Sequence, residues 1–138
     1  MNWNRIYGKK GFYQYQCVIP KAYEKEGIKE LLTEIQKSGQ GSFLAVLKSF
    51  GDIEPVGMMS FPMEGTTLAL DFPNLNDKTL SLFSRLDAIV KAAEGRLYPA
   101  KDARMPKEMF ESGFDAAIER FEAFVDPQFC SNFWSRVR

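Results

Sequence analysis

Apolar and polar residues alternate along FYQYQCVIP, residues 12–20, a stretch that ends at a proline. A two-residue period is typical of a β-strand whose two faces differ. The residues with odd numbers, beginning with Tyr13, would share one face, and those with even numbers would share the other. The second face would carry two glutamines, Gln14 and Gln16, so the strand is predicted to bury only one side fully.

Three further segments show strand patterns. SFLAVLKSF (42–50) would present Leu44, Val46, Lys48 and Phe50 on one face. TTLALDF (66–72) is apolar and is stopped by a proline, and residues 96–99 form a short fourth strand. Residues 51–57 read as a turn, and residues 58–62 as a short extended piece.

Helical spacing separates these strands. Residues 21–38 carry apolar side chains at intervals of three and four, with Gly39 suited to the position after the last turn. Residues 77–94 repeat the pattern and stop at Gly95. Pro106 fits the first position of a short helix, and a second apolar stripe follows from residue 114 to residue 125. The phenylalanines of this region are predicted to lie in the core: Phe110, Phe114, Phe121 and Phe124.

The element order is β-α-β-β-α-β followed by helices, which predicts an α+β fold of the ferredoxin-like kind in one domain, residues 1–138. Its antiparallel sheet would have helices on one face and extra C-terminal helices. The uncovered face would then present Gln14, Gln16, Lys48, Thr67 and Asp71. Such a mixture of polar and apolar groups suits a ligand or a second domain better than a dry core.

Composition limits the binding partners and the kinds of catalysis that we expect for this chain. Eighteen basic residues balance eighteen acidic ones, so no net charge favours nucleic acid or an anionic membrane. No residue is histidine, which excludes a histidine general base, and Cys17 and Cys130 alone do not form a zinc site. Dinucleotide and P-loop fingerprints are missing. Catalysis would therefore use Lys, Tyr, Asp or Glu, or a cofactor held elsewhere. No signal peptide is visible at the N-terminus, and we expect a cytoplasmic protein.

Several ordered blocks resemble a known family. They are WNRIYG (3–8), GFYQYQCVIP (11–20), SFLAVLKSFG (42–51), SFP (60–62), LALDFP (68–73), GRLYPAKDAR (95–104) and the ending DP…F…SR (126–136). Together they resemble the C-terminal substrate-binding (cap) domain of FAD-linked oxidases of the vanillyl-alcohol-oxidase type, in particular the decaprenylphosphoryl-ribose oxidase group. The resemblance covers nearly the whole chain.

The resemblance implies an enzyme of two domains, in which an N-terminal domain binds FAD and the cap closes over the flavin. We therefore expect this chain to be the cap alone, inactive without an FAD-binding domain or subunit, and to act on a sugar or alcohol hydroxyl by hydride transfer. Lys101 of the Y-x-A-K motif would reach both flavin and substrate. The substrate-binding residues carried over are Gln14, Gln16, Leu44, Val46, Lys48 and Phe50. The chain departs from the group at Thr67 and Ala69, where the decaprenyl enzymes often have Asn and Cys.

Plainer interpretations remain open for the same residues. Lys101 would be a surface lysine paired with Asp102 or Asp71, the glutamines would lie on an exposed strand, and Lys48 would guard a sheet edge against aggregation. For the whole chain, the alternative is a non-enzymatic ferredoxin-like binding or assembly module that forms homo-oligomers through its open sheet face.

Overall fold

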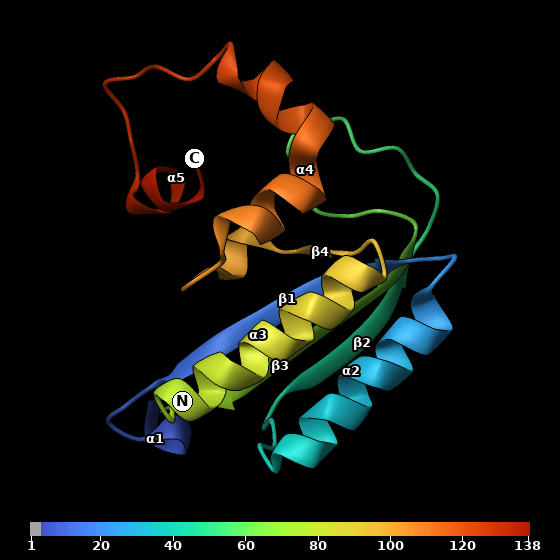
Figure 1. The fold of residues 1–138 in the computed structure, drawn as a ribbon, viewed down its shortest axis with the longest axis vertical. Helices are drawn as coiled ribbons and strands as arrows, with labels where there is room; N and C mark the ends of the chain where they lie inside the picture. The colour runs from blue at the N-terminus through green and yellow to red at the C-terminus, as the bar shows by residue number, and fades with distance from the viewer. Residues whose placement is uncertain (1–3) are drawn as a thin grey trace.

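The computed structural model describes residues 4–138 (Figure 1). Trp3 of the WNRIYG block lies outside the described residues. The strands are β1 (Phe12–Pro20), β2 (Ala45–Phe50), β3 (Gly65–Pro73) and β4 (Arg96–Leu97). The helices are α1 (Asn4–Tyr7), α2 (Glu24–Ser38), α3 (Asp77–Ala92), the 3₁₀ turn η1 (Pro99–Lys101), α4 (Lys107–Glu122) and α5 (Asn132–Val137).

The four strands form one antiparallel sheet in the order β2-β3-β1-β4. This order, combined with the β-α-β-β-α-β sequence of elements, confirms the predicted ferredoxin-like α+β fold. The second strand in sequence lies at one edge, and the first and third strands occupy the centre. The sheet is therefore built almost wholly from pairings between segments distant in sequence.

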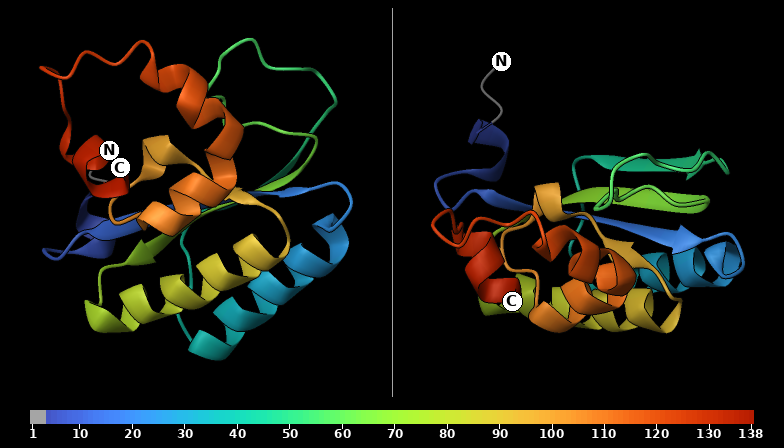
Figure 2. Two further views of the ribbon diagram at one scale, coloured as in Figure 1. Left: turned by 45° about the horizontal axis from the view of Figure 1, so that its top comes forward. Right: turned by 90° about the horizontal axis from the view of Figure 1, so that it is seen from above.

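Helices α2 and α3 cover one face of the sheet, as the edge-on view in Figure 2 shows. The strand residues that point toward them are buried, among them Tyr15, Cys17, Leu68 and Phe72. They pack against Leu82, Phe83 and Leu86 of α3. Burial of these side chains is the main force that holds helix to sheet. The opposite face has no helical layer, as the alternation in β1 predicted.

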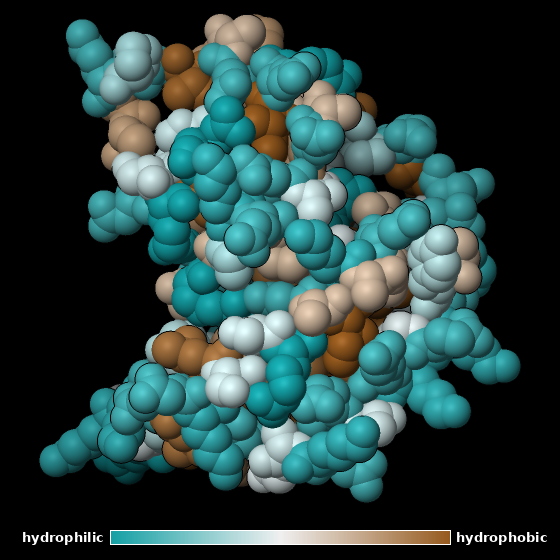
Figure 3. Space-filling model, in the orientation of Figure 1, coloured by the Kyte–Doolittle hydropathy of each residue, from teal (hydrophilic) through white to brown (hydrophobic). Residues whose placement is uncertain are grey.

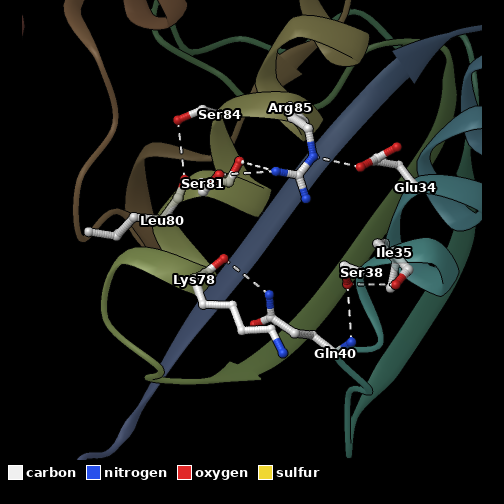
Figure 4. A network of polar contacts seen from close by, with 9 residues as sticks. All are labelled: Glu34, Ile35, Ser38, Gln40, Lys78, Leu80, Ser81, Ser84 and Arg85. Atoms are coloured by element: carbon white, nitrogen blue, oxygen red, sulfur yellow. Dashed lines mark hydrogen bonds and ion pairs between the residues drawn. The ribbon is translucent and has the colours of Figure 1, made fainter.

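Polar contacts join α2 and the residues just after it to α3 (Figure 4). Arg85 Nε donates to Glu34 Oε1 over 2.6 Å at the surface, and Nε2 of the buried Gln40 donates to the backbone oxygen of Lys78 over 3.2 Å. Gly39 ends α2 with a left-handed φ of 67°, the conformation predicted for its position. The solvent-exposed Arg85–Glu34 pair fixes direction more than it adds stability.

Several element boundaries differ from the sequence prediction. Helix α2 begins three residues late, because the backbone N–H of Tyr23 closes a turn onto the oxygen of Pro20. Strand β4 has two residues instead of four, and the chain turns into η1 at Pro99, which has no N–H to donate to a strand. Residues 58–62 pair with no strand among the described residues.

The C-terminal region holds the largest correction. The predicted short helix and apolar stripe form one continuous helix, α4, which buries Phe110 and Phe114. Phe124, predicted to lie in the core, is 75% exposed because α4 has already ended at Glu122. The tail forms α5, capped by the Ser131 hydroxyl, which accepts the N–H of Trp134. Within residues 4–138, no helix combines the length and apolar character needed to cross a membrane.

Gly65 occupies the start of β3 with a φ of +145°, which side chains disfavour. A Cβ placed there would overlap the backbone oxygen of Ile19 and approach the nitrogen of Lys21 to 2.9 Å. We expect Gly65→Ala to lower the free energy of unfolding by about 2 kcal/mol, measured by urea denaturation. Gly41→Ala is the matched control, since its Cβ meets nothing within 4 Å. Equal effects of the two substitutions would contradict this explanation.

Candidate functional site

The open sheet face brings together side chains from three neighbouring strands. The register pairs Gln16 with Ala69 and Ala69 with Val46, so these three form one row across the sheet. The next row toward the start of β1 pairs Gln14 with Asp71. Strand alternation then sets the side chains of both rows on the same face.

A cavity of about 230 Å³ lies on this face. Six of the seven residues predicted to form the site line it: Gln14, Gln16, Leu44, Val46, Lys48 and Lys101. Tyr15, Thr67, Ala69, Leu70 and Asp71 complete the wall. The motifs QYQ, FLAVLK and YPAK are distant in sequence, and the fold joins them at one hollow.

Both glutamines are oriented by neighbours within the sheet. Gln14 Nε2 donates to Asp71 Oδ1 over 3.0 Å, and Gln16 Nε2 donates to Thr67 Oγ1 over 3.2 Å. Thr67 in turn donates its hydroxyl to the backbone oxygen of Cys17. These contacts engage the amide nitrogens and leave both amide oxygens as acceptors for a ligand in the cavity. Groups that donate hydrogen bonds, such as hydroxyls, suit such a wall.

Asp71 is a buried carboxylate on this otherwise open face, with 2% of its surface exposed. Besides Gln14, its partner is Tyr7 of α1, whose hydroxyl donates to Oδ2 over 3.2 Å. Burial, together with the Asp71 charge, raises the pKa of the Tyr7 phenol. Tyr7 was not among the predicted site residues. The only sequence signal for it was its place in the WNRIYG block.

Lys101 ends η1 and reaches the cavity from the side of β4. Its segment is tied to β1 because Tyr98 N–H donates to the backbone oxygen of Gln16 over 2.9 Å. The plainer interpretation paired Lys101 with Asp102 or Asp71. Within residues 4–138, Asp102 pairs instead with Arg136, and Asp71 is held by neutral donors. Lys101 is thus a half-buried residue that lines a cavity, outside the described ion pairs.

Phe50 and Lys48 differ from the other predicted residues. Phe50 does not line the cavity; its ring meets Phe61 edge-on at 6.1 Å, and Phe61 stacks on Tyr98. Lys48 lines the cavity, yet it also lies on the edge strand β2 with its ammonium 5.2 Å from the centre of the Phe50 ring. The position of Lys48 is compatible with both roles that the sequence left open.

A buried ion pair fixes the loop that follows Lys101. Arg104 contacts both carboxylate oxygens of Asp87, with Nη2 at 2.9 Å from Oδ1. Tyr15 donates its hydroxyl to the same Oδ1 over 3.0 Å, and the guanidinium lies 5.0 Å from the centre of the Phe83 ring. The loop 98–105 is therefore anchored to α3 and β1, which limits where Lys101 can move.

The Cys17 thiol and the Tyr15 phenol, both buried near this ion pair, lose their protons only at unusually high pH. Burial raises the pKa of the Cys17 thiol to about 12 and raises that of the Tyr15 phenol well above its ordinary value of 10.0. The unfolded chain releases both protons at ordinary pKa values, so the free energy of unfolding falls as pH rises from about 9 toward 12. Urea denaturation at several alkaline pH values measures this. Tyr15→Phe removes one of the two groups and should make the free energy of unfolding depend less steeply on pH. An unchanged slope would contradict this explanation.

Comparison with known proteins identifies relatives of this chain. Over 99% of the chain, 38% of residues are identical to decaprenylphosphoryl-β-D-ribose oxidase of Mycolicibacterium smegmatis. The predicted resemblance is confirmed: the chain is related to this oxidase group. A second relative, described as an uncharacterized protein in the mprA 5′ region of Streptomyces coelicolor, is 29% identical over 86% of the chain. No family model matches the sequence.

The chain corresponds to only part of each of these two relatives. It spans 30% of the length of the Mycolicibacterium smegmatis oxidase and 32% of the Streptomyces coelicolor protein. More than two thirds of each relative therefore has no counterpart in these 138 residues. The match to the Mycolicibacterium smegmatis oxidase covers 99% of this chain, and so includes the segments that line the cavity.

Proposed function

We propose that this chain is the substrate-binding part of an FAD-dependent oxidoreductase that oxidises a sugar or alcohol hydroxyl. The observation that carries the proposal is the cavity that joins the QYQ, FLAVLK and YPAK segments on one sheet face. Its wall combines hydrogen-bond acceptors, two lysines and an apolar side formed by Leu44 and Val46. Such a wall is suited to a polyol with an apolar substituent.

The residues present fit the edge of a flavin ring but not the whole cofactor. Lys101, a half-buried residue, lines the cavity, whereas the chain has no glycine-rich fingerprint to hold a pyrophosphate. When bound, a flavin would be the acceptor of the hydride. Lys101 would place its positive charge where negative charge develops at the ring, and would orient a substrate hydroxyl. Gln14 and Gln16 would accept from the remaining hydroxyls and fix the carbon that reacts.

The proposed reaction would convert the carbinol to a carbonyl, with the hydride of the C–H bond taken up by bound flavin and the hydroxyl proton released to water. Lys101, Gln14 and Gln16 would hold the alcohol in position for this transfer. The chain contributes binding and orientation of the alcohol and one fixed positive charge. FAD would be held mainly by a separate domain or subunit, so the isolated chain is expected to show no turnover.

A reconstitution experiment tests the proposal. The flavin fragment is defined here as the part of the Mycolicibacterium smegmatis oxidase without a counterpart in this chain, purified in its yellow, FAD-bound form. We expect the chain and the flavin fragment to co-elute as a yellow complex that reduces a redox dye with decaprenylphosphoryl-β-D-ribose or a simple sugar. Failure to form any complex with the yellow fragment would contradict the proposal.

One observation favours a second candidate function. Strand β2 is an edge strand with an exposed backbone, and Phe43 and Leu47 beside it are also exposed. An open edge of this kind is a template for pairing with a second copy. A non-enzymatic module that self-associates through this edge and the open face would be a stable dimer by sedimentation and would not bind the flavin fragment.

A further inference from the structure

An apolar groove of about 660 Å³ lies between α4 and the C-terminal segment. Its wall is mainly aromatic and includes Phe110, Phe121, Phe124, Phe129, Phe133 and Trp134. In Figure 3, hydrophobic surface is visible at the top of the view, over α4 and the segment that follows it. Clustered aromatic surface of this kind marks interaction sites on folded proteins.

Two aromatic residues of the groove are largely exposed to solvent. Phe124 is 75% exposed and Phe129 is 80% exposed. Phe124 belongs to an apolar stripe whose period predicted burial, so the sequence is patterned for a core that residues 4–138 do not complete. Exposing two phenylalanine rings is unfavourable unless another surface buries them.

The floor of the groove is preformed. Phe110 meets Phe133 edge-on at 5.4 Å and Trp134 edge-on at 6.1 Å. Arg136 Nε donates to the backbone oxygen of Met105 over 3.2 Å, and this contact holds α5 against the body of the protein. Since these side chains are already ordered, a partner would not have to pay for ordering them on binding.

The groove and the cavity share one short element. Pro99 of η1 lines the groove, and Lys101 of the same turn lines the cavity. A body seated in the groove would therefore lie next to the Lys101 corner of the proposed site. This adjacency distinguishes the groove from the exposed apolar residues of the 51–57 loop, which line a separate hollow.

We propose that the groove docks the flavin-binding part of the oxidase, with Phe124 and Phe129 as anchors. The occupant is chosen because more than two thirds of each relative lies outside the stretch matched here, and because the groove adjoins the residue proposed to face the flavin. The inference rests on the proposed function and adds the surface through which the two parts join.

The test compares two double variants for binding to the flavin fragment, measured by isothermal titration. Phe124→Ser with Phe129→Ser removes the anchors without touching the buried core. Ile53→Ser with Val56→Ser is the matched control, because these side chains are at least as exposed but lie outside the groove. We expect the first pair to raise Kd by roughly 30-fold or more, as for aromatic hot spots, and the second to leave it nearly unchanged.

A second readout needs no substitution. Cys130 lines the groove and is exposed, whereas Cys17 is buried. Alkylation at mildly alkaline pH should modify Cys130 alone, and the flavin fragment should slow this reaction at least about tenfold at saturation, since an occupied interface excludes the reagent.

The outcomes separate the two proposals. A yellow, active complex that tolerates the Phe124 and Phe129 substitutions and leaves Cys130 reactive would overturn the docking inference alone. No complex with the unmodified chain would overturn both. If the chain alone forms a dimer, and the same substitutions dissociate it, the groove belongs to a second copy. If the chain binds neutral phospholipid vesicles, and the same substitutions abolish this binding, the groove belongs to a lipid. Either result overturns the inference.

Discussion

Replacing Lys101 by alanine is expected to lower the rate of flavin reduction about 100-fold or more in the complex with the flavin fragment, the usual loss when one preorganised charge-stabilising group is removed. Lys101 lines the cavity and is outside the ion pairs of the described residues. Its ammonium is therefore available to a ligand. The measurement is anaerobic bleaching of the flavin absorbance after mixing with substrate.

Two further variants serve as controls for Lys101→Ala. Lys101→Arg keeps the charge and should retain more activity than Lys101→Ala. Lys91→Ala removes an exposed lysine at the end of α3, away from the cavity, and should have no effect. An unchanged rate for Lys101→Ala, with the complex still formed, would return Lys101 to the class of surface lysines.

Replacing Asp87 by alanine is expected to cost about 3 kcal/mol of unfolding free energy, because the change leaves a charge buried without its partner. The side chain of Arg104 is only 20% exposed, and Tyr15 would lose the acceptor of its buried hydroxyl. Urea denaturation at neutral pH measures the loss. Since Arg104 anchors the loop that follows Lys101, the same variant should also weaken substrate binding in the reconstituted complex.

The control for Asp87 is an ion pair of similar chemistry at the surface. Glu34 accepts from Arg85, whose side chain is 48% exposed. Glu34→Ala should cost below about 1 kcal/mol, as solvent screens such pairs. If Asp87→Ala and Glu34→Ala destabilise equally, the ion pair does not anchor the loop in the manner described.

The parts of the site that depend on strand alternation were predictable from sequence. A two-residue period fixes which side chains share a face, so Gln14 with Gln16, and Leu44 with Val46 and Lys48, were placed together correctly. Phe50 followed the same rule and lies on the same face, but it packs on Phe61 beyond the end of the cavity. Strand alternation predicts which side chains share a sheet face, but it does not predict how far a cavity on that face extends.

Contacts between distant segments were not predictable in the same way. No local pattern joins Arg104 to Asp87 or Tyr7 to Asp71, because each pair is brought together only by the packing of separate elements. Tyr7 lies in a four-residue helix, too short to leave a periodic signal. The exposure of Phe124 was missed because apolar periodicity does not fix where a helix stops: α4 ends at Glu122, before the apolar stripe does.

We propose that these 138 residues supply the substrate pocket of a flavin-dependent oxidase whose cofactor is held elsewhere. The decisive experiment is anaerobic mixing of decaprenylphosphoryl-β-D-ribose with the yellow flavin fragment, with and without this chain. We expect the flavin to bleach only when the chain is present. A flavin that stays oxidised in the purified complex with this substrate and with a panel of simple sugars, or one that bleaches equally well without the chain, would contradict it.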